Sequence, residues 1–160
     1  MSLQEVKGET SRVWVFKDIV IKEQTAFLEY DLLCREKTIL SVLDKYHHFP
    51  KVRLWLGKIL GLSYCGVPVI KATLPDDWEV QLAEIHSALV KEKIIHRDVR
   101  PENFLIKDCM LYLIDFGWAI LKDEPPFGPD CIGDKFKSPT GWDDNYSFQQ
   151  VVNYWKHIND

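Results

Sequence analysis

The stretch HRDVRPENFLIKDCMLYLIDFG, residues 96–117, indicates both the fold of this chain and the chemistry it can support. It contains Asp98, then Asn103 five positions later, then Asp115 another twelve positions on. Carboxylate and amide oxygens are the ligands that hard divalent cations prefer in proteins. These three side chains could therefore supply the oxygen donors for a bound cation.

The same stretch resembles the catalytic segment of protein kinases, which combines His-Arg-Asp, an Asn at the fifth position after the Asp, and Asp-Phe-Gly. The resemblance extends over about residues 8–155. It implies that Asp98 orients or deprotonates the acceptor hydroxyl, and that Asn103 and Asp115 hold Mg²⁺ on the phosphates of ATP. Arg100 stands where Ser/Thr kinases usually carry Lys, and its guanidinium would neutralise charge on the γ-phosphate.

The run Ile19-Val20-Ile21-Lys22 is similar to the kinase strand that ends in the phosphate-binding lysine. Glu36, in the helical run REKTIL, is similar to the helix glutamate that pairs with that lysine in the family. Glu23 and Glu29 remain alternative partners for Lys22.

The glycine-rich loop that covers the phosphates in kinases is reduced here to Gly8. Thr10 and Ser11 follow it, and their hydroxyls would bind phosphate oxygens in a reduced loop similar to that of RIO-like kinases. The alternative is that these residues form an ordinary turn.

Residues 62–66 resemble the segment of kinases that binds adenine. In that interpretation the Ser63 C=O and the Cys65 N–H face the base, and Leu62 is the gatekeeper. Val20 and Leu105 would lie on the two faces of the base.

Residues 118–137, after Asp-Phe-Gly, contain no Ser, Thr or Tyr. Activation by phosphorylation of that stretch, through a phosphate paired with Arg97, is therefore excluded. We hypothesise that a fixed carboxylate takes the place of the phosphate; the alternative is a flexible acidic loop without a partner. The candidates are Asp123, Glu124, Asp130 and Asp134.

Other residues of the resemblance are expected to be structural. Leu40, His96 and Phe116 match an internal hydrophobic spine, and we expect them to pack against one another. His86 is expected to be a packed histidine and not a ligand. Asp144 matches the helix aspartate that supports the His-Arg-Asp backbone.

The hydrophobic patterning predicts an α+β fold. With the resemblance, we expect a minimal two-lobed protein kinase-like fold: a small antiparallel sheet plus one helix, then a mostly helical lobe that lacks the family's late C-terminal helices. The predicted strands are 13–16, 19–22, 52–56, 58–64 and 111–114; the predicted helices are 24–46, about 75–95 and 143–158; and 119–141 is predicted to be an extended loop.

Length and composition suit one domain over residues 1–160, with an N-lobe at 1–66 and a C-lobe at 67–160. Residues 67–160 hold sixteen Asp and Glu against ten Lys and Arg, which argues against nucleic acid as a ligand and suits metal ions and a basic acceptor segment. The four cysteines form no CxxC pair, and no leader or apolar membrane segment is evident. We expect a soluble cytoplasmic protein, in the host cytosol if it is an effector or viral kinase.

The expected activity is Mg²⁺-dependent transfer of the γ-phosphoryl group of ATP to a protein Ser or Thr. Two alternatives remain open: a small-molecule or sugar kinase of the same fold, and a nucleotide-binding pseudokinase that acts as a scaffold.

Overall fold

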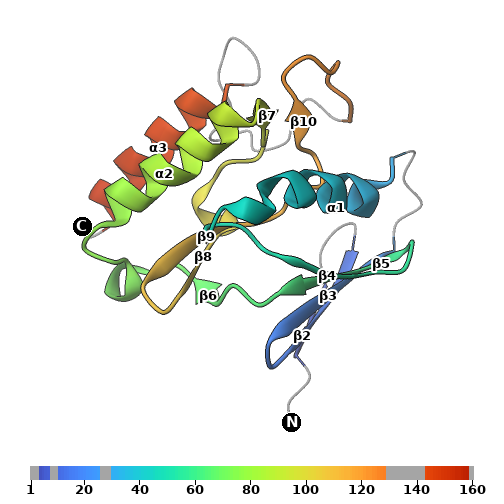
Figure 1. Ribbon diagram of the computed structural model, residues 1–160. Helices are drawn as coiled ribbons and strands as arrows, with labels where there is room; N and C mark the ends of the chain where they lie inside the picture. Colours follow the sequence, from blue (N-terminus) through green and yellow to red (C-terminus); the bar gives the residue numbers. More distant parts are fainter. Residues whose placement is uncertain (1–3, 8–10, 26–29, 129–142, 159–160) are drawn as a thin grey trace.

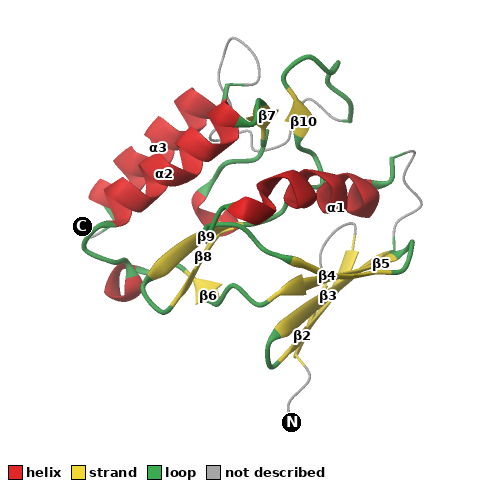
Figure 2. Cartoon of the chain, in the orientation of Figure 1, coloured by secondary structure: helices red, strands yellow, loops and turns green. Residues whose placement is uncertain are grey.

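The computed structural model describes residues 4–7, 11–25, 30–128 and 143–158. Within these ranges the fold is α+β, as predicted, with three α-helices and three antiparallel sheets (Figures 1 and 2). This architecture is compatible with a small two-lobed kinase-like fold.

The first part of the chain forms a five-stranded antiparallel sheet in the order β1-β2-β3-β5-β4. A two-residue turn at Lys17 and Asp18 joins β2 to β3, as the polar pair between two β-branched runs predicts. Gly57, with φ +67°, lies between β4 and β5 in a conformation that favours glycine. The strands are β1 (Gln4–Lys7), β2 (Ser11–Phe16), β3 (Ile19–Gln24), β4 (Val52–Trp55) and β5 (Ile59–Ser63).

Helix α1 (Leu32–Val42) packs on this sheet and is shorter than the predicted helix 24–46. Gln24 does not begin the helix, because it pairs with Ser11 at the end of β3. Asp31 caps the start of the helix, because its side chain accepts a hydrogen bond from the Cys34 N–H over 2.9 Å. The helix gives way to a short 3₁₀ helix at Leu43–Lys45.

The rest of the described chain contains helices α2 (Trp78–Lys91) and α3 (Asp144–Lys156), which lie side by side (Figure 1). Trp78 of α2 contacts Trp155 of α3 edge to face, with ring centroids 5.5 Å apart. Both predicted helices are confirmed, and Asp143 caps α3 by accepting from the Asn145 N–H.

Short strands complete this part of the chain. Of these only the strand at 111–114 was predicted. Three of the others have two residues each and leave no readable alternation, and the four-residue strand at 104–107 was not predicted either. The segment 119–141, predicted to be an extended loop, begins instead with a short strand that pairs with the residues before His96. The strands are β6 (Val67–Pro68), β8 (Phe104–Lys107) and β9 (Met110–Leu113) in one sheet, and β7 (Ile94–Ile95) with β10 (Ile120–Leu121) in another.

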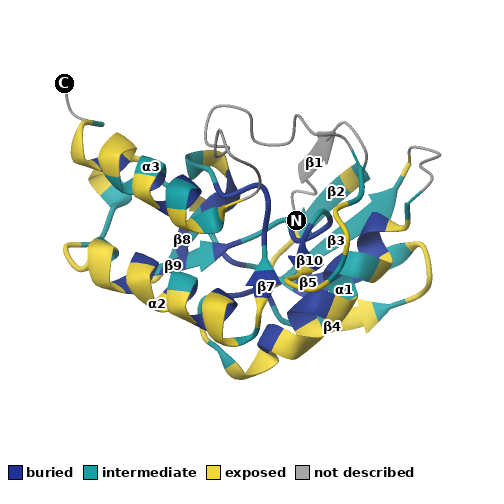
Figure 3. Ribbon diagram, turned by 90° about the horizontal axis from the view of Figure 1, so that it is seen from above, coloured by how far each residue is buried: buried dark blue, intermediate teal, exposed yellow. Residues whose placement is uncertain are grey.

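A continuous hydrophobic core joins α1 to α2 and α3. Phe49 and Phe116 belong to this core and are fully buried. Figure 3 shows exposed positions on the outer faces of α2 and α3, whereas β2 and β3 of the five-stranded sheet are mainly of intermediate burial. None of the helices in the described ranges is long and apolar enough to cross a membrane.

Candidate active site

Lys22 and Glu36 form a buried ion pair between β3 and α1. The Lys22 Nζ lies 2.8 Å and 3.0 Å from the two carboxylate oxygens of Glu36. Burial alone lowers the pKa of Lys22, but the Glu36 and Asp115 carboxylates outweigh it and hold this pKa above its ordinary value. Of the three glutamates considered as partners, the structure pairs Glu36 with Lys22, and Glu29 lies outside the described residues.

Asp115 lies next to this pair. Its carboxylate is 3.8 Å from the Lys22 Nζ and half exposed. The backbone of Asp115 has φ +69°, and the following Phe116 N–H donates to Glu36 over 3.4 Å. The left-handed conformation is costly for a residue other than glycine, and such strain concentrates at functional sites.

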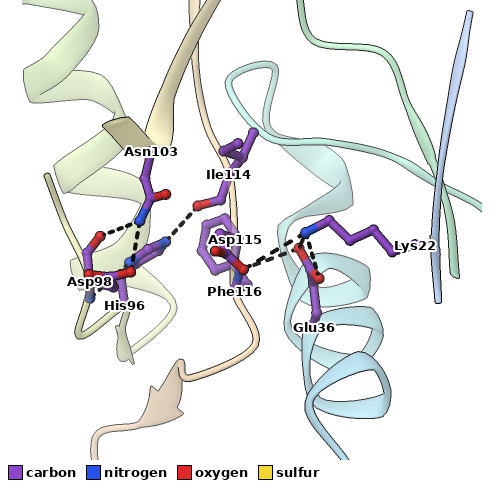
Figure 4. A network of polar contacts seen from close by, with 8 residues as sticks. All are labelled: Lys22, Glu36, His96, Asp98, Asn103, Ile114, Asp115 and Phe116. Atoms are coloured by element: carbon purple, nitrogen blue, oxygen red, sulfur yellow. Dashed lines mark hydrogen bonds and ion pairs between the residues drawn. The ribbon is translucent and has the colours of Figure 1, made fainter. Parts of the chain in front are cut away.

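On the other side of Asp115 and Phe116 lies a second polar group, built around His96 (Figure 4). The His96 Nε2 is 2.9 Å from the Ile114 C=O. Since a carbonyl oxygen only accepts, Nε2 carries the ring hydrogen and donates a hydrogen bond to this oxygen. The Nδ1 then accepts from the Asp98 N–H over 3.2 Å. Burial lowers the pKa of His96 to about 4, so the ring is neutral at physiological pH.

Asp98 is held by its neighbours in sequence. The Asn103 Nδ2 donates to the Asp98 C=O over 2.8 Å and to its carboxylate over 3.0 Å, and the Arg100 Nε lies 3.3 Å from the other carboxylate oxygen. Burial raises the pKa of Asp98 to about 6, although Arg100 and Asn103 oppose the rise. A carboxylate poised near neutral pH suits proton transfer.

Asp144 at the start of α3 fixes the backbone of this loop, as the resemblance implied. Its carboxylate oxygens accept from the His96 N–H over 2.7 Å and from the Arg97 N–H over 3.2 Å. Burial raises the pKa of Asp144 to about 6, against the effect of these two hydrogen bonds.

A cavity of about 50 Å³ lies where the phosphates of a nucleotide were expected. Its lining includes Lys22, Glu36, Asp115 and also Ser11, so the structure brings Ser11 to the predicted phosphate site. Ligand pockets commonly measure about 300–1,000 Å³, so in this state the cavity is too small for a triphosphate. Gly8 and Thr10, the other two residues of the predicted phosphate loop, lie outside the described residues.

The donor chemistry of the site suits Mg²⁺. Both hydrogen bonds of the Asn103 amide use its nitrogen, and no described residue donates to its oxygen, Oδ1. The Asn103 Oδ1 and the half-exposed Asp115 carboxylate are each hard oxygen donors. Within the described ranges no cluster of three or more His, Cys, Asp or Glu side chains is suited to a metal.

The residues predicted to contact adenine do not line this cavity. Val20 and Leu62 are direct cross-strand neighbours on β3 and β5. The Ser63 C=O accepts from the Cys65 thiol over 3.5 Å, and no described residue accepts from the Cys65 backbone N–H. Leu105 lies on β8, opposite Pro68 and Tyr112.

The expected spine residues are packed, as predicted. Leu40, His96 and Phe116 are buried, and the His96 and Phe116 rings meet edge to face with centroids 4.6 Å apart. His86 stacks on Phe148 at 4.5 Å, which confirms its structural role.

Of the four carboxylates proposed as partners of Arg97, Glu124 binds a different arginine. The Glu124 carboxylate binds Arg35 over 2.7 Å. Arg97 donates to the Trp118 C=O over 3.2 Å, and its guanidinium lies 5.4 Å from the centre of the Phe127 ring. Of the other candidates, Asp123 is exposed, and Asp130 and Asp134 lie outside the described residues.

Sequence reasoning did not identify Arg35 as part of the site. The available signal was its position directly before Glu36 in a predicted helix. Glu124 and Arg35 are 89 positions apart, so no local pattern pairs them.

Comparisons with known proteins give partial similarity to protein kinases. No family model matches the chain. An Aurora kinase of Candida glabrata is 51% identical over 45 residues, which cover 28% of this chain and 13% of that protein. An Aurora kinase of Saccharomyces cerevisiae is 43% identical over 54 residues, which cover 33% of this chain and 14% of that protein. The matches therefore span a small part of these relatives and indicate a protein kinase-like relationship.

Proposed function

We propose that this protein transfers the γ-phosphoryl group of ATP to a Ser or Thr hydroxyl of a protein, with Mg²⁺ as cofactor. The observation that supports this best is the position of Asp115, whose carboxylate is 3.8 Å from Lys22 while the preceding Ile114 C=O is bound to His96 of the catalytic loop (Figure 4). The partial similarity to Aurora kinases supports kinase-type phosphotransfer in general.

In the proposed mechanism the Lys22 ammonium binds the phosphates, and Glu36 keeps this ammonium in place. The Asp98 carboxylate accepts the proton of the acceptor hydroxyl. The hydroxyl oxygen forms a bond to the γ-phosphorus, the bond from that phosphorus to the β–γ bridging oxygen breaks, and ADP leaves. Arg100, beside Asp98, offsets negative charge on the group in transfer.

Asn103 and Asp115 would hold the cation. Bound there, Mg²⁺ would neutralise the phosphate charge. The nucleotide also requires the small cavity beside Lys22 to widen, because about 50 Å³ holds water and not a triphosphate.

We propose that residues 1–66 and 67–160 are the two lobes of one kinase-like domain. Adenine would lie between Val20 and Leu105 and against residues 62–65.

An acceptor with a basic segment suits the excess of acidic over basic residues in 67–160. A cytoplasmic location suits four cysteines without a CxxC pair.

The small cavity also favours a second candidate, a scaffold that binds a nucleotide weakly and transfers no phosphate.

The proposal is tested by incubating the protein with labelled ATP and Mg²⁺, first with a generic basic protein as acceptor and separately with a panel of sugars and amines. We expect transfer to the protein, loss of transfer with retained ATP binding in Asp98→Asn, and loss of Mg²⁺-dependent ATP binding in Asp115→Ala.

The matched control is Asp108→Asn, which changes an exposed aspartate in the turn between β8 and β9 and should transfer normally. Transfer only to a sugar or amine would replace the protein acceptor. Thermal stabilisation by ATP and Mg²⁺ without transfer to any acceptor, unchanged in Asp98→Asn, would establish the scaffold.

A further inference from the structure

The ion pair between Arg35 and Glu124 joins α1 to the segment that follows Asp-Phe-Gly. The Arg35 Nη1 is 2.7 Å from the Glu124 Oε2, and both side chains are partly buried. Arg35 directly precedes Glu36 in α1, so a contact that fixes Arg35 also limits the movement of Glu36 relative to Lys22.

Glu124 itself is held in a tight turn. Its N–H donates to the Leu121 C=O over 2.9 Å, and its carboxylate accepts from the Leu121 N–H over 2.9 Å. Leu121 belongs to β10, which pairs with β7 directly before His96, and the Lys122 N–H donates to the Lys93 C=O over 2.8 Å. Because β10 lies beside β7 (Figure 1), the carboxylate that meets α1 is anchored to the strand that leads into the catalytic loop.

An aromatic cluster supports the same contact. The Tyr30, Trp118 and Phe127 rings contact one another with centroids 5.1–6.2 Å apart. The Arg35 guanidinium lies 5.2 Å from the centre of the Phe127 ring, a distance typical of a cation–π contact. Gly128, with φ +77°, lets the chain approach Trp118, because a Cβ there would lie 2.2 Å from that ring.

We propose that Glu124 is a positioning residue: through Arg35 it holds α1 where Glu36 meets Lys22. The carboxylate does this without a phosphorylated side chain, and residues 118–137 offer no Ser, Thr or Tyr to carry one. The inference rests on the proposed function, because it concerns the assembly of the same phosphate-binding lysine.

The test follows the exposure of the Lys22 amine in the nucleotide-free protein. Brief acetic anhydride labelling is read at Lys22 by peptide mass spectrometry, with Glu36→Gln as the reference for a released lysine. Glu124→Gln should raise the Lys22 labelling rate about fivefold, the scale of one partly exposed ion pair. Asp123→Asn, which removes the neighbouring carboxylate of the same turn, should leave the rate unchanged.

Charge reversal gives the rescue. Arg35→Glu and Glu124→Arg should each raise Lys22 labelling, and the double variant should return it close to that of the parent protein. The inference would be overturned by an unchanged Lys22 labelling rate in Glu124→Gln, or by a double variant whose Lys22 is as reactive as in either single variant. Circular dichroism checks that each variant is folded. The labelling needs no ATP, so a parent protein that transfers no phosphate refutes the proposed function while the labelling still decides the role of Glu124.

Discussion

The Asp144 carboxylate accepts a hydrogen bond from the His96 backbone N–H over 2.7 Å, although the two residues are 48 positions apart. The same carboxylate accepts from the Arg97 N–H. Asp144→Ala leaves both buried donors without this acceptor, so we expect the free energy of unfolding to fall by about 3 kcal/mol. Urea unfolding measures the change.

The matched control is Asp143→Ala, which removes only the cap of α3 and should cost about 1 kcal/mol. Equal losses in the two variants would show that Asp144 acts as a second helix cap and does not support the loop.

Variants of the Lys22–Glu36 pair should affect the stability of the fold and the binding of ATP in different ways. Lys22→Met leaves a buried carboxylate without its cation, so unfolding should become easier by about 3 kcal/mol. Lys22→Met combined with Glu36→Leu should recover most of that loss, because apolar residues of similar volume replace buried ion pairs at little cost. Urea unfolding checks both values.

ATP binding should follow a different pattern in these variants. Stabilisation by ATP and Mg²⁺ in a thermal shift experiment should be lost in the single and the double variant alike. A double variant that ATP still stabilises would show that Lys22 is not the phosphate ligand.

The parts of the fold and site that could be predicted are those with local signals. The turn between β2 and β3 follows from a polar pair between two β-branched runs. The start of α3 near residue 143 was also predicted, but the sequence leaves open whether Asp143 or Asp144 caps it, and the structure selects Asp143. Glu36 was predicted as the partner of Lys22 because the resemblance supplied both positions and the spacing between them.

The remaining features depend on contacts between distant segments. The hydrophobic pattern predicts a helix from residue 24 onward. The structure starts α1 later, because Gln24 pairs with Ser11 in the sheet and Asp31 caps the helix. Glu124 was one of four candidate partners of Arg97, yet it meets Arg35, because the choice between two arginines depends on the contact between α1 and the segment after Asp-Phe-Gly.

Gly66 provides a test of the link between the five-stranded sheet and β6. It has φ +100°, and a Cβ there would lie 1.9 Å from the Ile106 C=O. Gly66→Ala should destabilise the protein by more than about 3 kcal/mol, since both the backbone conformation and the contact become unfavourable. Chemical denaturation is the measurement.

Gly57→Ala is the matched control. Gly57 also has a positive φ, of +67°, but nothing lies within 4 Å of its would-be Cβ, so the cost should be about 1 kcal/mol. Similar losses for both glycines would mean that the approach of Ile106 does not restrict this position.

The pH dependence of transfer tests the role of Asp98. Burial raises the pKa of Asp98 to about 6, and a base must be deprotonated to act, so kcat should fall by about tenfold between pH 7 and pH 5. Arg100 lowers this pKa and Glu102 raises it. Arg100→Gln should therefore move the acidic limb of the pH–rate profile to higher pH, and Glu102→Gln should move it to lower pH.

The two shifts in opposite directions distinguish Asp98 from Asp144. The pKa of Asp144 is also about 6, but neither Arg100 nor Glu102 contributes to it. The quantity to compare is the pH at which the acidic limb reaches half of its maximal rate. The maximal rate itself is not compared, because Arg100→Gln also removes charge near the transferred group. A limb that stays in place in both variants but moves in Asp144→Asn would assign the titration to Asp144, and Asp98 would then not be the base.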